Sequence, residues 1–283
     1  MPIRKTRFAG TWYPDDPGAC AHEIETFLSG AEPSLNTDGP FVGGIVPHAG
    51  WYFSGSIACN VIHRLVPGPR ADTILVFGMH MPPDVRPVMM PDGAWETPLG
   101  PVPVDTELAA GLQEAFPFHL ESPARFLQDN TIELQMPFIK HAFPDSRVLA
   151  MGVPFSEEAL KIAEAAVRVA AGQQKQIRVI GSTDLTHYGP NYGFTPKGHG
   201  PDALTWVKTK NDARFIAAVL AMAPRQMLTE AATAGNACCA GAAAAAMTAG
   251  IKLGSEQALL YAYATSADKQ PGDSFVGYAG ILF

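Results

Sequence analysis

The chain has 283 residues, of which 47% are hydrophobic and 17% charged, so it can bury a sizeable core. Its formal net charge of −7 argues against the basic surface that a nucleic-acid-binding protein needs. It has no run of about 18 apolar residues that could span a membrane, and no apolar signal peptide at its N-terminus. Two of the four cysteines are adjacent, which is not a disulfide pattern. We therefore expect a cytoplasmic globular protein with reduced thiols, and neither nucleic-acid nor membrane partners.

Apolar stretches of strand length alternate with helical patterns along the chain. In chain order, the predicted strands are 42–46, 73–78, 147–153, 176–182, 258–264 and 275–282. The predicted helices are 17–29, 54–65, 105–116, 156–171, 203–222 and 237–249. Because the strands are apolar almost throughout, both of their faces should be covered. The pattern predicts an α/β fold, with residues 1–283 forming a single layered domain around a central, largely parallel or mixed sheet flanked by helices.

Residues that can bind a metal follow three of the predicted strands. His48 follows the first strand, His80 follows the second, and Asp184 and His187 follow the fourth. If these strands are parallel neighbours, the side chains meet at the carboxyl edge of the sheet, where open α/β proteins build their sites. Two imidazoles and a carboxylate suit zinc, iron and copper alike. Each histidine alone could equally be a hydrogen-bonded turn residue, but three such strand ends together favour a site.

Cys238 is a further candidate ligand. It lies at the start of an alanine-rich predicted helix, for which Asn236 is the expected N-cap. A thiol near a helix N-terminus has a lowered pKa, which favours the thiolate that metals bind. The alternative is a small buried cysteine packed beside alanines, which is the commoner place for a free cysteine.

Three other residues have a predicted place around the site. Glu133 lies four residues before Pro137, which should interrupt or begin a helix. We expect its carboxylate to support a site histidine, although it could simply be a charge at a helix start. Trp51 and Tyr52 come soon after His48 and could form an aromatic wall for a planar substrate. Aromatic residues between a strand and a helix more often fill the core, which is the alternative for both.

Seven short motifs together resemble those of one family. They are FAGTWYPDD, IVPHAGWYFSG, ILVFGMH, NTIELQMPF, GSTDLTHYG, NACCAG and FVGYAG, and they run in this order from residue 8 to residue 280. PHAG after a strand followed later by S-x-D-x-x-H is a specific combination. On these motifs the chain resembles the Memo family, whose bacterial and archaeal members are often called AmmeMemoRadiSam system protein B.

The resemblance implies the fold of the class III extradiol dioxygenases, which cleave aromatic rings with non-haem iron(II). It implies that His48, His80 and Cys238 bind the metal, with Fe2+ as the expected ion and Zn2+ or copper as alternatives. It places His187 at the position of the dioxygenase acid–base residue, with Asp184 beside it as an orienting carboxylate.

Two motifs depart from the family pattern. The turn FGMHMPP is one residue shorter than usual and offers His80 alone, where the family commonly has two histidines in a row. Cys239 stands where the family has a glycine, which makes it a rival ligand. We prefer Cys238, because Ala237–Cys238 matches the Ala-Cys pair of the family.

The leading hypothesis is a metal-dependent oxidoreductase of extradiol-dioxygenase type that acts with O2 on a small molecule, such as an aromatic one. A thiolate in place of the usual carboxylate ligand would shift the site toward zinc or copper(I). The alternative is a non-enzymatic metal- or ligand-binding module that handles iron or copper, or binds a protein partner of radical-SAM type. Because a pure adaptor needs no acid–base pair, the presence of Asp184 and His187 favours chemistry.

Overall fold

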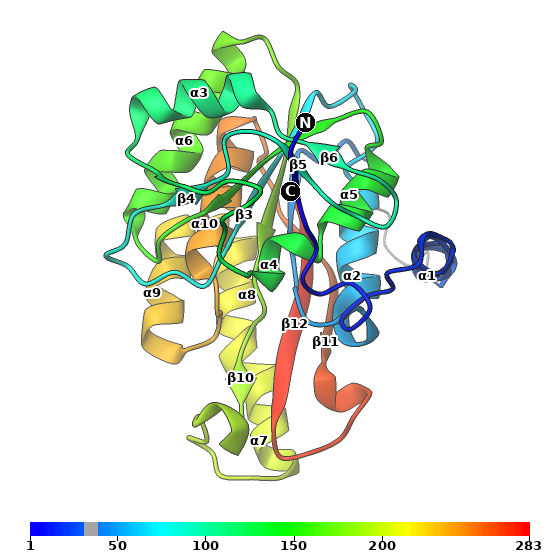
Figure 1. Ribbon diagram of the computed structural model, residues 1–283. Coiled ribbons are helices and arrows are strands. Elements are labelled where there is room, and N and C mark those ends of the chain that lie inside the picture. Colours follow the sequence, from blue (N-terminus) through cyan, green and yellow to red (C-terminus); the bar gives the residue numbers. More distant parts are fainter. Residues whose placement is uncertain (31–38) are drawn as a thin grey trace.

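One large mixed sheet forms the centre of the protein (Figure 1). The computed structural model describes residues 1–30 and 39–283. Four parallel strands lie at the middle of the sheet in the order β2 (Gly43–Val46), β9 (Ile177–Ser182), β3 (Thr73–Gly78) and β8 (Arg147–Gly152). Antiparallel β12 (Phe275–Leu282) extends it beyond β2, and β11 (Leu259–Thr265) pairs with β12. Three short strands complete this sheet: β10 (His187–Tyr188), β4 (Val88–Met89) and β7 (His119–Leu120).

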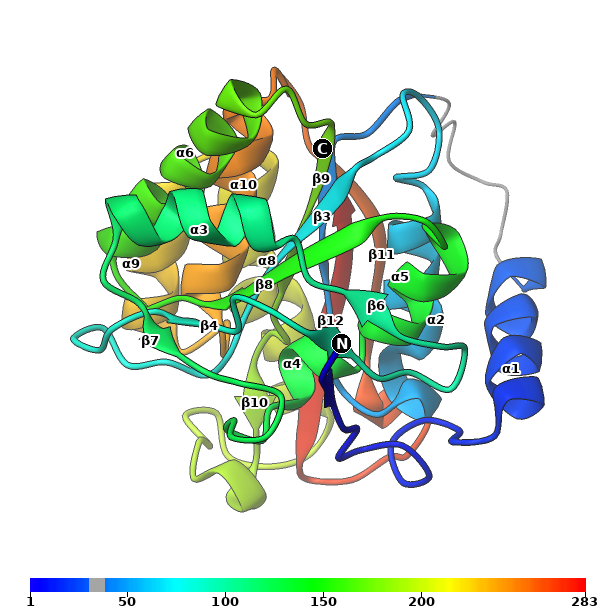
Figure 2. The same ribbon diagram turned by 45° about the horizontal axis from the view of Figure 1, so that its top comes forward.

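Helices cover both faces of the sheet, which explains why its strands are apolar on both sides (Figure 2). One face carries α10 (Ala240–Lys252) and α6 (Glu157–Gly172), with α9 (Pro224–Ala234) and α3 (Thr106–Ala115) outside them. The other face carries α2 (Trp51–His63), packed against α1 (Pro17–Ser29) and α5 (Met136–Ala142). The remaining helices are α4 (Asn130–Glu133), α7 (Pro201–Trp206) and α8 (Asp212–Leu220). A small separate sheet contains β1 (Ile3–Arg4), β5 (Ala94–Trp95) and β6 (Val102–Pro103).

The predicted α/β architecture is confirmed, and every predicted strand is present with ends that differ by at most one residue. The predicted helix 203–222 is wrong as a single α-helix, because a turn of π-helix over Val207–Asn211 separates α7 from α8. Helix α9 was not predicted. Among the described helices, none is both long enough and apolar enough to cross a membrane.

The predicted start of the alanine-rich helix is also wrong. Helix α10 begins at Ala240 with Cys239 as its N-cap, three residues later than expected. Asn236 is buried, and its side-chain amide donates a hydrogen bond to the carbonyl of Asn211 instead of capping the helix. Cys238 therefore lies in the loop that leads into α10, next to the carboxyl end of β9.

Helix α10 lies close against β9 because small residues face each other there. A side chain at Gly181 would place its Cβ 2.7 Å from the Ala246 Cβ and 2.9 Å from the Ala242 carbonyl oxygen. The residues of α10 from Ala240 to Gly250 are all buried. The alanine run of the sequence is thus a packing surface, and it fixes the position of the loop that carries Cys238.

This packing predicts that Gly181→Val destabilises the protein by about 1–3 kcal/mol, because the added methyl groups must push α10 away from β9. Gly172→Ala is the matched control, since no atom lies within 4 Å of a Cβ added there. Urea unfolding of the two variants measures the difference. Equal stability of Gly181→Val and the unmodified protein would contradict the packing argument.

Candidate metal centre

Three strand ends meet at the carboxyl edge of the sheet. Strand β9 lies between β2 and β3, and all three run in the same direction. His48 follows β2 after Pro47, His80 lies two residues beyond β3, and Asp184 lies two residues beyond β9. His187 begins β10, which pairs with β12 on the far side of β2. The convergence expected for parallel neighbouring strands is therefore present.

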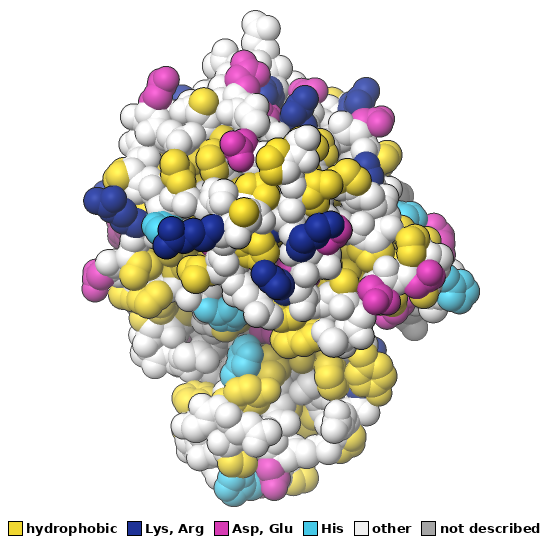
Figure 3. Space-filling model, in the orientation of Figure 1, with side chains coloured by type: hydrophobic (Ala, Val, Ile, Leu, Met, Phe, Trp, Pro, Cys, Tyr) yellow, Lys and Arg dark blue, Asp and Glu magenta, His cyan; other side chains and the backbone are white. Residues whose placement is uncertain are grey.

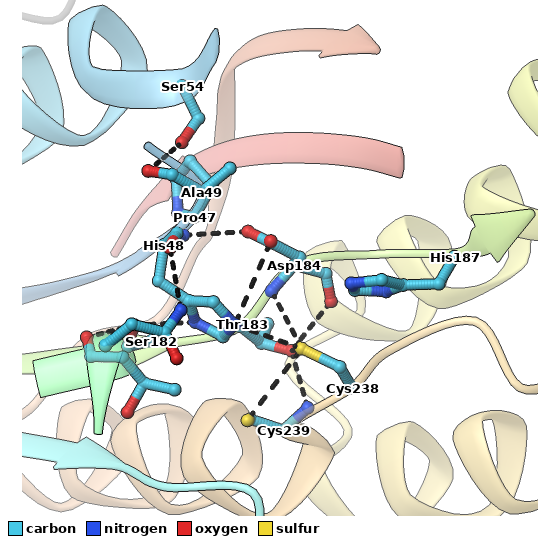
Figure 4. Close-up of polar contacts among 12 residues, drawn as sticks. Pro47, His48, Ala49, Ser54, Ser182, Thr183, Asp184, His187, Cys238 and Cys239 are labelled. Atoms are coloured by element: carbon cyan, nitrogen blue, oxygen red, sulfur yellow. Dashed lines mark hydrogen bonds and ion pairs between the residues drawn. The ribbon is translucent and has the colours of Figure 1, made fainter. Parts of the chain in front are cut away.

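The His48 imidazole is held in one orientation by its neighbours. Its Nδ1 lies 3.0 Å from the Ser182 hydroxyl oxygen, and that hydroxyl donates its own hydrogen to the Thr131 carbonyl at 2.7 Å. Because the hydroxyl hydrogen is used, the Ser182 oxygen must accept from Nδ1–H. The Nε2 atom then faces the Cys238 Sγ at 3.3 Å (Figure 4). In metal sites, the ring nitrogen that does not bind the metal usually donates a hydrogen bond, and this bond fixes the orientation of the histidine. The contact between Nδ1 and Ser182 is a bond of this type.

Hydrogen bonds of Asp184 connect His48, which follows β2, with Cys238 in the loop before α10. Its carboxylate accepts the backbone N–H of His48 at 2.7 Å. Its carbonyl accepts the backbone N–H of Cys238 at 3.1 Å, and its own N–H donates to the Cys238 sulfur at 3.3 Å. Burial raises the pKa of the Asp184 carboxyl, although the nearby His48 acts in the opposite direction. Asp184 thus positions two candidate ligands through the backbone.

The ionisation of His48 and Cys238 is coupled. Burial alone lowers the pKa of His48, but Asp184 and Cys238 outweigh it and raise the pKa to about 9. Burial disfavours the Cys238 thiolate, yet the hydrogen bond between Cys238 and Cys239 and the nearby His48 hold the pKa of Cys238 well below its ordinary value. Both shifts favour an imidazolium beside a thiolate. A cation can take the place of the shared proton.

His80 completes the group from the turn that follows β3. It is solvent-exposed, and its ring centroid lies 5.1 Å from that of the buried His48. The turn that presents it contains Met79 with a φ of 68°, a conformation that is strained for a residue with a side chain. The Met79 N–H donates to the Thr131 hydroxyl at 2.7 Å, which holds this turn. Strained backbone of this type is commonly found at functional sites.

The side chains fit a transition metal. One ligand atom from each of His48, His80, Cys238 and Cys239 can be chosen so that all lie within 4.8 Å of one another. Two imidazoles and soft sulfurs are the donors that zinc, copper and non-haem iron accept. The donor set and the Ser182 hydrogen bond thus meet the requirements of a metal site.

A cavity of about 930 Å³ opens directly over this group. His48, His80, Asp184 and His187 all line it, and the cysteines do not. Figure 3 shows histidine side chains in the hollow between the main body and the lobe that carries α7 and β10. The other aromatic and polar lining residues include Trp12, Tyr52, Phe53, Asn130, Tyr192 and Tyr278. The volume is that of a small-molecule site.

His187 reaches this cavity from β10, and its imidazole points toward Asp184 (Figure 4). Its Nδ1 lies 3.2 Å from the carbonyl oxygen of Leu185, which can only accept a hydrogen bond. The hydrogen therefore lies on Nδ1, and Nε2 is the nitrogen that can take up a proton. The ring also contacts Tyr192 edge-on, with centroids 5.0 Å apart.

Two of the predicted site residues lie elsewhere. The Glu133 carboxylate accepts the backbone N–H groups of Arg7 and Phe8 at 2.8 Å each, so it anchors the N-terminal segment and does not line the cavity. Trp51 is 1% exposed and stacks on Phe138 with ring centroids 4.2 Å apart, so it belongs to the core. Tyr52, its neighbour in sequence, does line the cavity.

Sequence reasoning missed several residues that complete the site. Ser182 is the first residue of S-x-D-x-x-H, and its place two residues before Asp184 is a usable signal for a role at the site. Trp12 lies in the motif FAGTWYPDD, yet nothing in the sequence placed that motif at the cavity. Thr131, whose carbonyl and hydroxyl support two strand ends, carried no signal of its own.

A protein-family model and curated relatives match this chain over nearly its whole length. A model of the Memo-like protein family matches residues 4–282. The chain is 30% identical to a MEMO1 family protein of Methanococcoides burtonii over 284 residues, which cover 99% of both chains. It is 31% identical to a MEMO1 family protein of Methanopyrus kandleri over 294 residues, covering 99% of this chain and 98% of that one. The crystal structure of uncharacterized protein JW3007 from Escherichia coli K12 is similar in fold, with a TM-score of 0.51, 11% identity, and coverage of 84% of this chain and 98% of that chain.

The hydrogen bond at His48 predicts that Ser182→Ala weakens metal binding by about 10–100-fold, because Nδ1–H loses its acceptor and the ring its orientation. Competition with a chelator measures zinc affinity in the variant and in a Ser54→Ala control. Ser54 donates to the Ala49 carbonyl and makes no contact with the His48 ring. Unchanged affinity in Ser182→Ala would show that this hydrogen bond does not position a ligand.

A buried carboxyl beside His187 predicts a pH dependence of stability. Asp212 accepts from the Thr186 N–H and from the Tyr263 hydroxyl, and burial raises its pKa to about 6. Between about pH 4 and pH 6 the folded state holds a proton that the unfolded state has lost, so stability falls as pH rises, by up to about 3 kcal/mol. Asp212→Asn should flatten this part of the profile in urea unfolding. An identical slope in both proteins would contradict the assignment.

Proposed function

Because the chain belongs to the Memo-like protein family, we propose that it is a metal-dependent oxidoreductase of extradiol-dioxygenase type. In this proposal His48, His80 and Cys238 bind one transition metal, with iron(II) as the expected ion. The substrate is a small, planar molecule that carries a hydroxyl group and binds in the cavity above the metal.

One observation carries the proposal: both proposed ligand histidines, His48 and His80, line the same cavity as His187. A site that only stores a metal needs no ligand cavity next to it. Here the exposed His80 and the buried His48 both lie on the cavity wall, so a bound molecule can reach the metal. The size of the cavity allows it to enclose a ring with its substituents.

The residues around the cavity have separate roles. The metal, when bound, supplies Lewis-acid and redox chemistry. The Nε2 atom of His187 accepts the proton of a substrate hydroxyl and can return it later. Tyr52 and Tyr192 offer aromatic surfaces against which a planar substrate packs. Asp184 keeps His48 and Cys238 in place through its backbone and side-chain hydrogen bonds.

A second candidate function is metal handling without turnover, either alone or with a protein partner. The feature that favours it is the sulfur-rich donor set, in which two adjacent cysteines face the histidines. Thiolates favour zinc and copper(I) over the iron(II) of carboxylate-bound oxygenases. The exposure of His80 also gives an ion a route from solvent.

Elemental analysis after anaerobic purification separates these functions. The oxidoreductase proposal predicts about one iron per chain, and the loss of that iron in His48→Ala and Cys238→Ala. Zinc or copper that is lost in the same variants would favour metal handling. If no metal binds even after reconstitution, the ligand assignment is wrong.

Turnover tests the role of His187. With iron bound, His187→Gln should keep its metal but lower the rate of ring cleavage of catechol probes by about 10²–10⁴-fold, the usual contribution of a general base. His199→Gln is the control, because His199 is an exposed histidine outside the cavity. Equal loss of rate in both variants, or no loss in either, would contradict the proposed proton transfer.

A further inference from the structure

We propose that Cys239 is a fourth protein ligand of the same metal, so that this chain forms a site with two histidines and two cysteines. The inference rests on the metal site proposed above and changes its composition. It treats the adjacent cysteines as joint ligands, whereas the sequence alone presents them as rivals.

The distance between the two sulfurs supports joint binding. The Sγ atoms of Cys238 and Cys239 lie 3.8 Å apart. Two thiolates bound to one tetrahedral zinc, each at about 2.3 Å, are separated by about 3.8 Å. The 3.3 Å from the Cys238 Sγ to the His48 Nε2 is likewise close to the value of about 3.5 Å for a sulfur and a nitrogen on the same ion. The sulfurs thus have the spacing that a shared ion requires.

The backbone holds Cys239 in this position. It is the N-cap residue of α10, and its N–H donates to the Thr183 hydroxyl at 3.0 Å. Thr183 also lies beside the Cys238 sulfur, so one short loop after β9 supports both cysteines (Figure 4). Among the described residues, the Cys238 sulfur is the hydrogen-bond partner of the Cys239 thiol.

Cys20 and Cys59, the other two buried cysteines, differ from Cys239 in what surrounds their thiols. The Cys59 sulfur lies between α1 and α2, 3.9 Å from the Ile24 carbonyl and 3.6 Å from the His63 Nδ1. Cys20 is also buried, on α1. Neither belongs to the described group whose ligand atoms come together. Cys239 therefore differs from them by its surroundings and not by its burial.

A second sulfur ligand changes which metals the site prefers. Two thiolates and two imidazoles form the donor set of many structural zinc sites, and thiolates also suit copper(I). The histidines line the cavity, whereas the cysteines do not.

Cobalt(II) provides the test, because each thiolate ligand adds intensity to its sulfur-to-metal absorption band. The unmodified protein should show about twice the band intensity of Cys239→Ala at equal cobalt content. Zinc affinity should fall at least about tenfold in Cys239→Ala, since losing even a hydrogen-bond partner of a ligand has that effect. Cys59→Ala is the matched control, and neither quantity should change in it.

X-ray absorption at the zinc edge of the unmodified protein gives an answer that does not depend on whether the variant folds. Two sulfurs per zinc support the proposal. One sulfur per zinc, or an unchanged cobalt band in Cys239→Ala, overturns it and leaves the site of His48, His80 and Cys238 in place. If the unmodified protein binds neither zinc nor cobalt, two assignments are wrong: Cys239 as a fourth ligand, and the metal site of His48, His80 and Cys238 on which it rests.

Discussion

The parallel pairing of β2, β9 and β3 is the constraint on which the rest of the site depends. The register places Val46 opposite Ser182 and Phe77 opposite Gly181, so the three strands end at nearly the same level. A shift of β9 by one residue would turn Ser182 away from His48, because side chains alternate between the faces of a sheet. The burial of these strands on both faces fixes the register, and with it the distances between the candidate ligands.

The candidate ligands differ in burial. On one side, Asp184 ties His48 and Cys238 together by backbone hydrogen bonds, and all of these contacts are at least partly buried. On the other side, His80 is exposed and is presented by a strained turn at Met79. Preorganised ligands on rigid elements bind with little loss of conformational entropy, whereas an exposed ligand allows exchange with solvent. This arrangement suits a metal that stays bound while a second molecule enters the cavity beside it.

The sequence predicted the strands and the convergence of their ends well, since long apolar runs have few other solutions in an α/β protein. It failed where tertiary contacts overrode local signals. Asn236 is a good N-cap residue, but its amide donates to the Asn211 carbonyl at the end of the π-helical turn, and the helix starts later. Trp51 lies within the motif IVPHAGWYFSG and Glu133 within NTIELQMPF, yet core packing and the N-terminal segment determine where their side chains point. Trp12 is far from the site in sequence, so no periodicity could place it at the cavity.

The most direct test of this account is a crystal structure of the metal-loaded protein with anomalous scattering data collected at the edge of the bound metal. The account predicts one strong anomalous peak bonded to the Nε2 of His48, to His80 and to the sulfur of Cys238, at the floor of the cavity that His187 lines. A fully occupied metal bound elsewhere on the chain, with these side chains still in contact with one another, would contradict it.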